Sequence, residues 1–172
     1  EVGHAEGYTS RYLAQAVKDN GLRYQVTSGM YYGIDIVQTE KVRDALTKLE
    51  LPNTIINMDS INLNKDTFSD NQFDLIFQDG AHDEEHVLHE LEVLYPKLKG
   101  DGKGYWIAHD VYGPSEEGYV KILKMIPKKY NFNSVLNIVS GKDESIFLFR
   151  NLSLKYYPNN PLMEQYEEKI DE

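Results

Sequence analysis

Acidic and imidazole side chains follow two apolar runs of the sequence, where strands are expected to end. Asp79 and His82 come after the run FDLIFQ, and His109 and Asp110 close the later run GYWIAH. In parallel sheets, ligands bind outside the carboxyl ends of the strands, and neighbouring strands bring these ends to one edge. Carboxylates and imidazoles are common proton acceptors and metal ligands. Each residue alone is typical of an ordinary turn, but four at paired strand ends predict a ligand site.

A second set of candidate ligand-binding residues lies earlier in the chain. The opening stretch EVGHAEGYTS places Gly3 and Gly7 before a helix, which predicts a ligand-binding loop or a tight turn. The stretch is not G-x-G-x-x-G, so a dinucleotide is disfavoured. Asp35 ends a predicted strand, which suits two hydrogen bonds to a ribose or an ordinary turn. Asp59 and Ser60 could bind an adenine edge or cap a turn.

Three histidines offer a different chemistry. His82, His86 and His89 are spaced i, i+4 and i+7 at the start of the predicted helix 83–99, so they could lie on one helical face and hold zinc. A solvated helix surface is the favoured interpretation, and a zinc hydrolase stays a distant alternative.

Helical stretches alternate with short β-branched or aromatic runs, which predicts βα units and a mostly parallel sheet. The first helix is expected to end at Gly21, and Pro96 is expected to kink or shorten the third. The last two strands are expected to pair antiparallel. The expected helices are residues 8–20, 39–49, 83–99 and 116–126, and the expected strands are residues 31–37, 54–58, 73–78, 104–109, 134–139 and 145–150.

The composition of the 172 residues is ordinary for one soluble domain, with 41% hydrophobic and 27% charged residues. A net charge of −10 disfavours nucleic acid as a partner. No apolar run is long enough for a membrane span, no cysteine is present, and no signal segment opens the chain, so we expect a cytoplasmic protein. Residues 1–150 are expected to form the domain, and the polar tail 151–172 could pack on another subunit of a homo-oligomer.

In their order along the chain, these motifs resemble the class I S-adenosylmethionine-dependent methyltransferases. They are most similar to the small-molecule O-methyltransferases, whose core has E-x-G-x-x-x-G-x-[ST], G-x-D, D-L-I-F-x-D-G-x-H and a later H-D. The matching stretches here are EVGHAEGYT, GID, DLIFQDGAH and HD. The resemblance implies a Rossmann-like α/β fold whose mostly parallel seven-stranded sheet has an antiparallel last strand. Glu1, Val2 and Gly3 would then be the end of a truncated first strand.

The resemblance also implies how the cofactor, S-adenosylmethionine, is bound. It assigns the methionine moiety to Glu1, Gly3 and Gly7. It places Asp35 on the ribose hydroxyls, and Asp59 with Ser60 near the adenine.

The same resemblance implies a metal-assisted reaction. Asp79, His109 and Asp110 stand where metal-dependent members hold a divalent cation, and His82 stands where they place a catalytic base. A cation lowers the pKa of a bound hydroxyl, whose proton an imidazole can then accept. Two carboxylates favour Mg²⁺, whereas a histidine ligand favours Mn²⁺. We therefore expect methyl transfer to a hydroxyl of a small molecule, catalysed by His82 and Asp79.

Two alternatives keep the fold and change the chemistry. In one, the enzyme is metal-independent and His82 acts alone. In the other, the domain binds the cofactor but has lost catalysis. The missing first strand and the absence of the N-terminal helices that usually cover the substrate keep this second alternative open.

Overall fold

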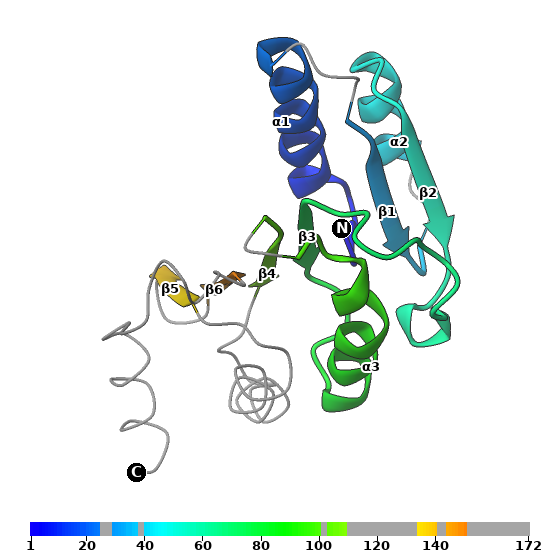
Figure 1. The fold of residues 1–172 in the computed structure, drawn as a ribbon. Coiled ribbons are helices and arrows are strands. Elements are labelled where there is room, and N and C mark those ends of the chain that lie inside the picture. The colour runs from blue at the N-terminus through cyan, green and yellow to red at the C-terminus, as the bar shows by residue number, and fades with distance from the viewer. Residues whose placement is uncertain (25–28, 38–39, 101–102, 110–133, 141–143, 151–172) are drawn as a thin grey trace. The chain divides into compact units, whose positions relative to one another are not determined.

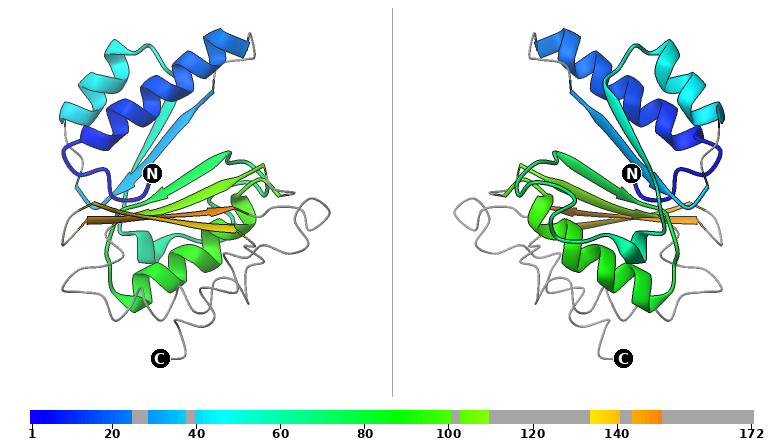
Figure 2. Two further views of the ribbon diagram at one scale, coloured as in Figure 1. Left: turned by 90° about the vertical axis from the view of Figure 1, so that its left-hand side faces the viewer. Right: turned by 90° about the vertical axis from the view of Figure 1, so that its right-hand side faces the viewer.

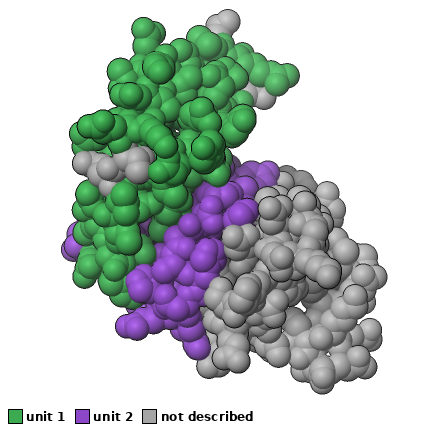
Figure 3. All heavy atoms as spheres, turned by 180° about the vertical axis from the view of Figure 1, so that it is seen from behind, with its two compact units in different colours: residues 1–62 green, residues 63–172 purple. Residues whose placement is uncertain are grey.

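The computed structural model describes residues 1–24, 29–37, 40–100, 103–109, 134–140 and 144–150. The chain divides into two compact units, Glu1–Asn62 and Leu63–Glu172, coloured separately in Figure 3. The predicted helix 116–126 and the tail 151–172 lie outside the described residues. Within the described part of the chain, no helix combines the length and the apolar character that crossing a membrane requires.

The first unit is built on a parallel pair of strands. Strand β1 (Tyr31–Asp35) pairs in register with β2 (Asn53–Asn57), and a parallel bridge joins Val2 to Ile34 on the other side of β1. The backbone at Val2 therefore lies along the free side of β1, although the contact is an isolated bridge and the expected end of a first strand at Glu1–Gly3 stays a prediction. Figures 1 and 2 show helices α1 (Tyr8–Tyr24) and α2 (Glu40–Lys48) side by side on one face of this sheet.

The core of the first unit lies between these helices and β1. Val42 and Leu46, one helical turn apart, bury the inner face of α2, as their spacing predicts. On α1, Ala14 is buried in this core, whereas Tyr12 is 76% exposed. The buried cluster consists of Ala14, Tyr31, Val42, Leu46 and Leu51.

Helix α1 also runs past its expected end. Gly21 lies inside the helix and is half-buried, on the same side as Ala14 and Val17. A glycine inside a helix costs about 1 kcal/mol relative to alanine. That penalty did not end α1, so the expected stop at Gly21 is wrong.

The second unit contains a four-stranded sheet of order β3-β4-β6-β5. Its strands are β3 (Leu75–Gln78), β4 (Tyr105–His109), β5 (Ser134–Ser140) and β6 (Glu144–Arg150). β3 and β4 are parallel, whereas β6 is antiparallel to both β4 and β5. The expected antiparallel last strand is thus confirmed, and the joining of all strands into one seven-stranded sheet stays a prediction.

Helix α3 (Glu84–Leu94) covers one face of the second sheet (Figure 2). Val87, Leu91 and Leu94 are buried, as their spacing predicts. The helix ends before the 3₁₀ turn Tyr95–Lys97, which contains Pro96. It is therefore shorter than the expected 83–99, because the proline ring prevents the helical hydrogen bonds from continuing.

Asp83 caps the start of α3. Its Oδ1 accepts a hydrogen bond of 3.1 Å from the backbone N–H of His86, and its Oδ2 lies 2.7 Å from Nδ1 of the same residue. Partial burial raises the pKa of Asp83, but the hydrogen bonds from the His86 side chain and backbone outweigh it, so the pKa lies below the ordinary 3.8. The folded state therefore favours the ionised cap.

The variant Asp83→Ala is expected to lower the free energy of unfolding by about 1 kcal/mol at neutral pH, because the helix loses its cap. Since the folded state depresses this pKa, the contribution is present above pH 3.8 and is lost as the pH falls through the folded-state value. Urea denaturation at pH 7 and pH 3 measures both effects. Asp83→Asn keeps a capping oxygen and should stay near wild type at pH 7. A deficit for Asp83→Ala that is equally large at both pH values would contradict this account.

A chain of polar side chains crosses the interior of the second unit. Gln78 at the end of β3 donates a 2.6 Å hydrogen bond from Nε2 to the Glu90 carboxylate of α3. Gln78 Oε1 accepts a 3.1 Å bond from the indole N–H of Trp106 in β4. All three side chains are fully buried. This chain of bonds fixes the end of β3, which is the residue before Asp79.

Candidate functional site

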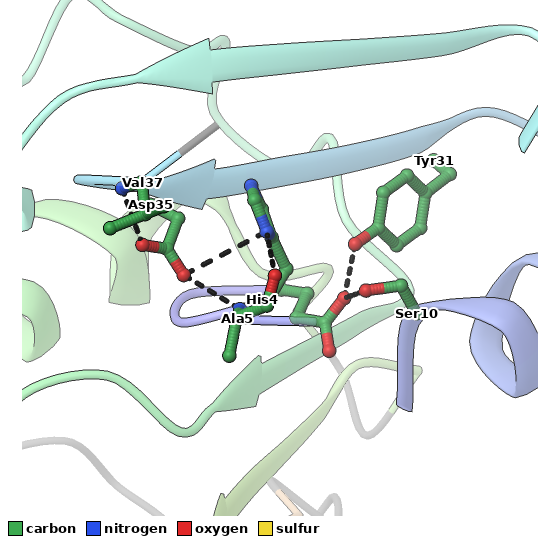
Figure 4. Close-up of polar contacts among 7 residues, drawn as sticks. His4, Ala5, Ser10, Tyr31, Asp35 and Val37 are labelled. Carbon is green, nitrogen blue, oxygen red and sulfur yellow. Dashed lines mark hydrogen bonds and ion pairs between the residues drawn. The ribbon is translucent and has the colours of Figure 1, made fainter. Parts of the chain in front are cut away.

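The loop after Val2 lies against the carboxyl end of β1, where Asp35 stands (Figure 4). Asp35 Oδ2 accepts a 2.8 Å hydrogen bond from the backbone N–H of Ala5, and Oδ1 accepts one of 2.8 Å from the N–H of Val37. The structure therefore brings the glycine loop and the predicted ribose-binding acid together. Each oxygen of Asp35 keeps a lone pair for a further donor.

Glu1 is held by two hydroxyl groups. Its Oε2 accepts hydrogen bonds from Ser10 Oγ at 2.5 Å and from the hydroxyl of Tyr31. Burial raises the pKa of Tyr31 above its ordinary value, and the neighbouring carboxylate raises it further, so the phenol stays a donor. The other oxygen, Oε1, is shielded from solvent and has no hydrogen-bond partner among the described residues. A buried acceptor of this kind fits a cationic donor.

The two glycines of the loop have a conformational role. Gly3 and Gly7 have φ values of 79° and 76°, in the left-handed region that favours glycine. A Cβ built on Gly7 would lie 2.6 Å from Cγ2 of Val42 in α2. Glycine at position 7 is therefore required by the turn and by the packing of α2, independently of any ligand.

Asp59 and Ser60 follow β2 at the same edge of the first sheet. Asp59 Oδ1 accepts a 3.2 Å hydrogen bond from the N–H of Ile61 and so caps the 3₁₀ turn Ser60–Asn62. The turn-capping alternative is thus observed for Asp59, and contact with adenine stays a prediction. The backbone bond from Met58 N–H to Asp35 O, at 3.0 Å, ties this turn to the end of β1.

All six predicted cofactor-binding residues thus lie in the first unit. They stand near the carboxyl ends of β1 and β2 or in the segment Glu1–Gly7. The six residues are Glu1, Gly3, Gly7, Asp35, Asp59 and Ser60.

The second unit gathers one carboxylate and two imidazoles. Asp79 follows β3 directly, and its Oδ1 lies 3.1 Å from Nδ1 of His109 at the end of β4. Nε2 of His82, in the loop before α3, lies 4.0 Å from the same oxygen. The three side chains are 23–28% exposed, so solvent or a ligand reaches them. The expected meeting of these strand ends is confirmed for these three residues, whereas Asp110 lies outside the described residues.

Two of the three predicted metal ligands, Asp79 and His109, lie within hydrogen-bond distance of each other. Among the described residues, no group of three or more His, Asp or Glu side chains is arranged to hold a metal ion. The 3.1 Å contact from His109 to Asp79 is the distance of a hydrogen bond that orients the carboxylate. The geometry therefore fits a positioning role for His109.

The three histidines of the zinc alternative have separate partners. His82 faces Asp79, His86 faces Asp83, and Nε2 of His89 lies 2.9 Å from the carbonyl oxygen of Leu63. Because α3 begins at Glu84, His82 precedes the helix and does not share a helical face with the others. These three residues therefore do not form the shared helical face that the zinc alternative requires.

The sequence motifs gave no indication of the partners that hold the site carboxylates. Tyr31 and Ser10 hold Glu1, and His4 lies beside Asp35. Both His4 and Ser10 are buried, and a buried polar side chain usually has a hydrogen-bond partner. The sequence does not show which polar residues become buried, so it gave no signal for these contacts.

Residues 1–111 match the family described as a methyltransferase domain. No curated protein matches the chain.

Solved structures share the fold at low sequence identity. An S-adenosylmethionine-dependent methyltransferase from Aquifex aeolicus has a TM-score of 0.59 at 20% identity, over 88% of this chain and 80% of that one. CalS11, a TDP-rhamnose 3′-O-methyltransferase of calicheamicin biosynthesis, has a TM-score of 0.59 at 14% identity, over 87% and 69%. A 1,6-didemethyltoxoflavin N1-methyltransferase from Burkholderia thailandensis, with bound S-adenosylhomocysteine, has a TM-score of 0.52 at 11% identity, over 87% and 80%. With the matched residues covering both glycines and Asp35, this chain belongs to the methyltransferase-domain family and has the Rossmann-like fold of class I methyltransferases.

Proposed function

We propose that this protein transfers a methyl group from S-adenosylmethionine to a hydroxyl group of a small molecule in the cytoplasm. Family and fold support the methyltransferase class. The observation that carries the cofactor assignment is Asp35, which ends β1 and accepts the N–H of Ala5 from the glycine loop. This is the edge of a parallel sheet at which ligands bind.

The residues of the first unit fit the cofactor chemically. The unpartnered, shielded Oε1 of Glu1 would accept the ammonium group of the methionine moiety, while Ser10 and Tyr31 keep the other oxygen fixed. Asp35 is an acceptor held by two backbone N–H groups, and a ribose offers two hydroxyl donors. Asp59 and Ser60 would face the adenine from the turn after β2.

His82 is the proposed general base. When bound, S-adenosylmethionine supplies an electrophilic methyl group on a sulfonium. His82 would accept the hydroxyl proton while the oxygen–carbon bond forms and the carbon–sulfur bond breaks. The Asp79 carboxylate, 4.0 Å from Nε2, would stabilise the imidazolium that results. His109 would keep Asp79 oriented for this task.

The metal question turns on Asp79. It would supply one oxygen ligand to Mg²⁺ or Mn²⁺, and His109 and Asp110 would supply the others. In the metal-independent alternative, the 3.1 Å contact between His109 Nδ1 and Asp79 Oδ1 would instead orient the carboxylate beside His82. Turnover that is lost on exhaustive chelation and restored by Mg²⁺ or Mn²⁺ would support metal assistance. Turnover that survives chelation would favour the metal-independent mechanism.

A small molecule is the proposed acceptor because the net charge of −10 opposes binding of a polyanion. The O-methyltransferase CalS11 shares the fold and acts on a sugar nucleotide, as its description states. A hydroxyl acceptor also agrees with a neutral imidazole as the base, since a hydroxyl must lose a proton on methylation.

Calorimetry with S-adenosylhomocysteine tests the cofactor assignment. We expect Asp35→Ala to weaken binding by about tenfold or more, because the two ribose hydroxyls lose their charged acceptor. Asp44→Ala, on the exposed side of α2, removes the same charge elsewhere and should bind like wild type. Equal affinity of the two variants would remove Asp35 from the site.

A turnover assay separates an enzyme from an inactive binding domain. The assay measures S-adenosylhomocysteine released from S-adenosylmethionine in the presence of catechols, phenols and sugars. Release with an acceptor supports the enzyme. Tight binding without release by any acceptor would favour a domain that has lost catalysis.

A further inference from the structure

A buried histidine lies beside the proposed ribose-binding carboxylate. The side chain of His4 is 1% exposed, and its Nδ1 lies 3.7 Å from Asp35 Oδ2 and 3.4 Å from the carbonyl oxygen of Ala5. Its other nitrogen, Nε2, is shielded from solvent and has no hydrogen-bond partner among the described residues. Of the two ring nitrogens, Nδ1 is therefore the one with polar neighbours, and they include the carboxylate.

The backbone around His4 is shaped to bring these groups together. Ala5 has a φ of 41°, a left-handed conformation that costs a non-glycine residue about 1–2 kcal/mol. In this conformation its N–H reaches Asp35 Oδ2 at 2.8 Å, the same oxygen that Nδ1 of His4 faces. The loop thus directs a backbone donor and an imidazole at one carboxylate oxygen.

Gly33 makes room for the imidazole in the middle of β1. A Cβ at this position would lie 3.1 Å from Cδ2 of His4, 3.0 Å from the hydroxyl oxygen of Tyr31 and 3.0 Å from Cδ1 of Ile55. The ring of His4 therefore packs against the backbone of β1 at the position where glycine has no side chain (Figure 4). This support fixes the ring while Nδ1 faces the end of the strand.

From these contacts we infer that His4 is a positioning residue for cofactor binding. It holds the Asp35 carboxylate in the orientation that leaves one lone pair on each oxygen for the two ribose hydroxyls. The inference rests on the proposed function, since it concerns how Asp35 meets the ribose. His4 itself touches no part of the cofactor in this role and acts only through the carboxylate.

Two substitutions test this role with matched chemistry. His4→Asn places an amide N–H near the position of Nδ1, whereas His4→Gln places it near the position of Nε2. We expect His4→Asn to bind S-adenosylhomocysteine within about threefold of wild type and His4→Gln to lose about tenfold, because His4→Gln removes the 3.7 Å polar contact with Asp35 Oδ2. Thermal unfolding of each variant shows whether the loop still folds.

A second ligand distinguishes positioning from a general structural role. The 2′,3′-dideoxy analogue of S-adenosylhomocysteine lacks both hydroxyls, so the loss caused by His4→Gln should disappear with it. If His4→Gln weakens both ligands equally, or neither, the positioning role is wrong while the proposed function stands. If wild type binds neither S-adenosylmethionine nor S-adenosylhomocysteine, the proposed function fails and this inference fails with it.

Discussion

The variant His82→Ala is expected to transfer methyl groups about 10²- to 10⁴-fold more slowly than wild type, while binding S-adenosylhomocysteine as tightly. The physical reason is the proton on the acceptor hydroxyl, which must leave as the methyl group arrives. His82 is one-quarter exposed and lies 4.0 Å from the Asp79 carboxylate, so it can receive a proton and be stabilised as a cation. The measurement is single-turnover release of S-adenosylhomocysteine with an acceptor that the wild type uses.

His86→Ala provides the matched control for this experiment. His86 is also an imidazole three residues after an aspartate, but its partner is Asp83 at the start of α3. Its removal should leave the rate within about threefold of wild type, because its contact is with the α3 cap and not with the proposed site. Equal rates for wild type and His82→Ala would remove His82 from the mechanism, and a slow His86→Ala would point to a fold defect shared by both variants.

The largest effect on stability is expected from Gln78→Leu. The substitution keeps the volume of the side chain but removes the donor to the Glu90 carboxylate and the acceptor for the Trp106 indole. All three groups are buried, and a buried charge that loses a partner costs more than a neutral group does. We expect the free energy of unfolding to fall by about 3 kcal/mol, measured by urea denaturation.

Two further variants identify the cause of that loss. Gln72→Leu removes a glutamine whose Oε1 accepts a solvent-exposed hydrogen bond of 3.0 Å from the N–H of Ser69, and it should cost less than about 1 kcal/mol. The double variant Gln78→Leu, Glu90→Leu removes the carboxylate as well and should recover part of the stability, because a buried apolar pair leaves no carboxylate to desolvate. A double variant as unstable as the sum of its parts would mean that packing, and not the lost hydrogen bonds, explains the deficit.

The sequence was sufficient to predict where chemistry-bearing residues stand along the fold. The runs around Ile34, Ile76 and Trp106 are apolar and bounded by turn residues, so their strands and the acids after them were predictable. Asp79 and His109 meet for this reason, because parallel neighbours end at the same edge.

The partners of the site carboxylates were not predictable. The contacts from Tyr31 to Glu1 and from Asp35 to the His4 loop join residues about 30 positions apart. No periodic pattern encodes such contacts, because they depend on the rotamer of each side chain and on the register of β1 against the Val2 segment. The continuation of α1 past Gly21 was not predicted for a related reason. The intrinsic cost of a glycine in a helix is a local quantity, and tertiary packing can outweigh it.

The position of β6 has a consequence for how the protein is made. Glu144–Arg150 forms the last described strand, yet it lies between β4 and β5. Among the described strands, β5 has no other neighbour, so a nascent chain on the ribosome would hold β5 and one side of β4 unpaired until this segment emerges. Unpaired strand edges are prone to associate with other chains. A chain whose translation stops before residue 144 would therefore be prone to aggregate. The need for chaperones should be greatest after β5 has left the ribosome and before β6 has followed it.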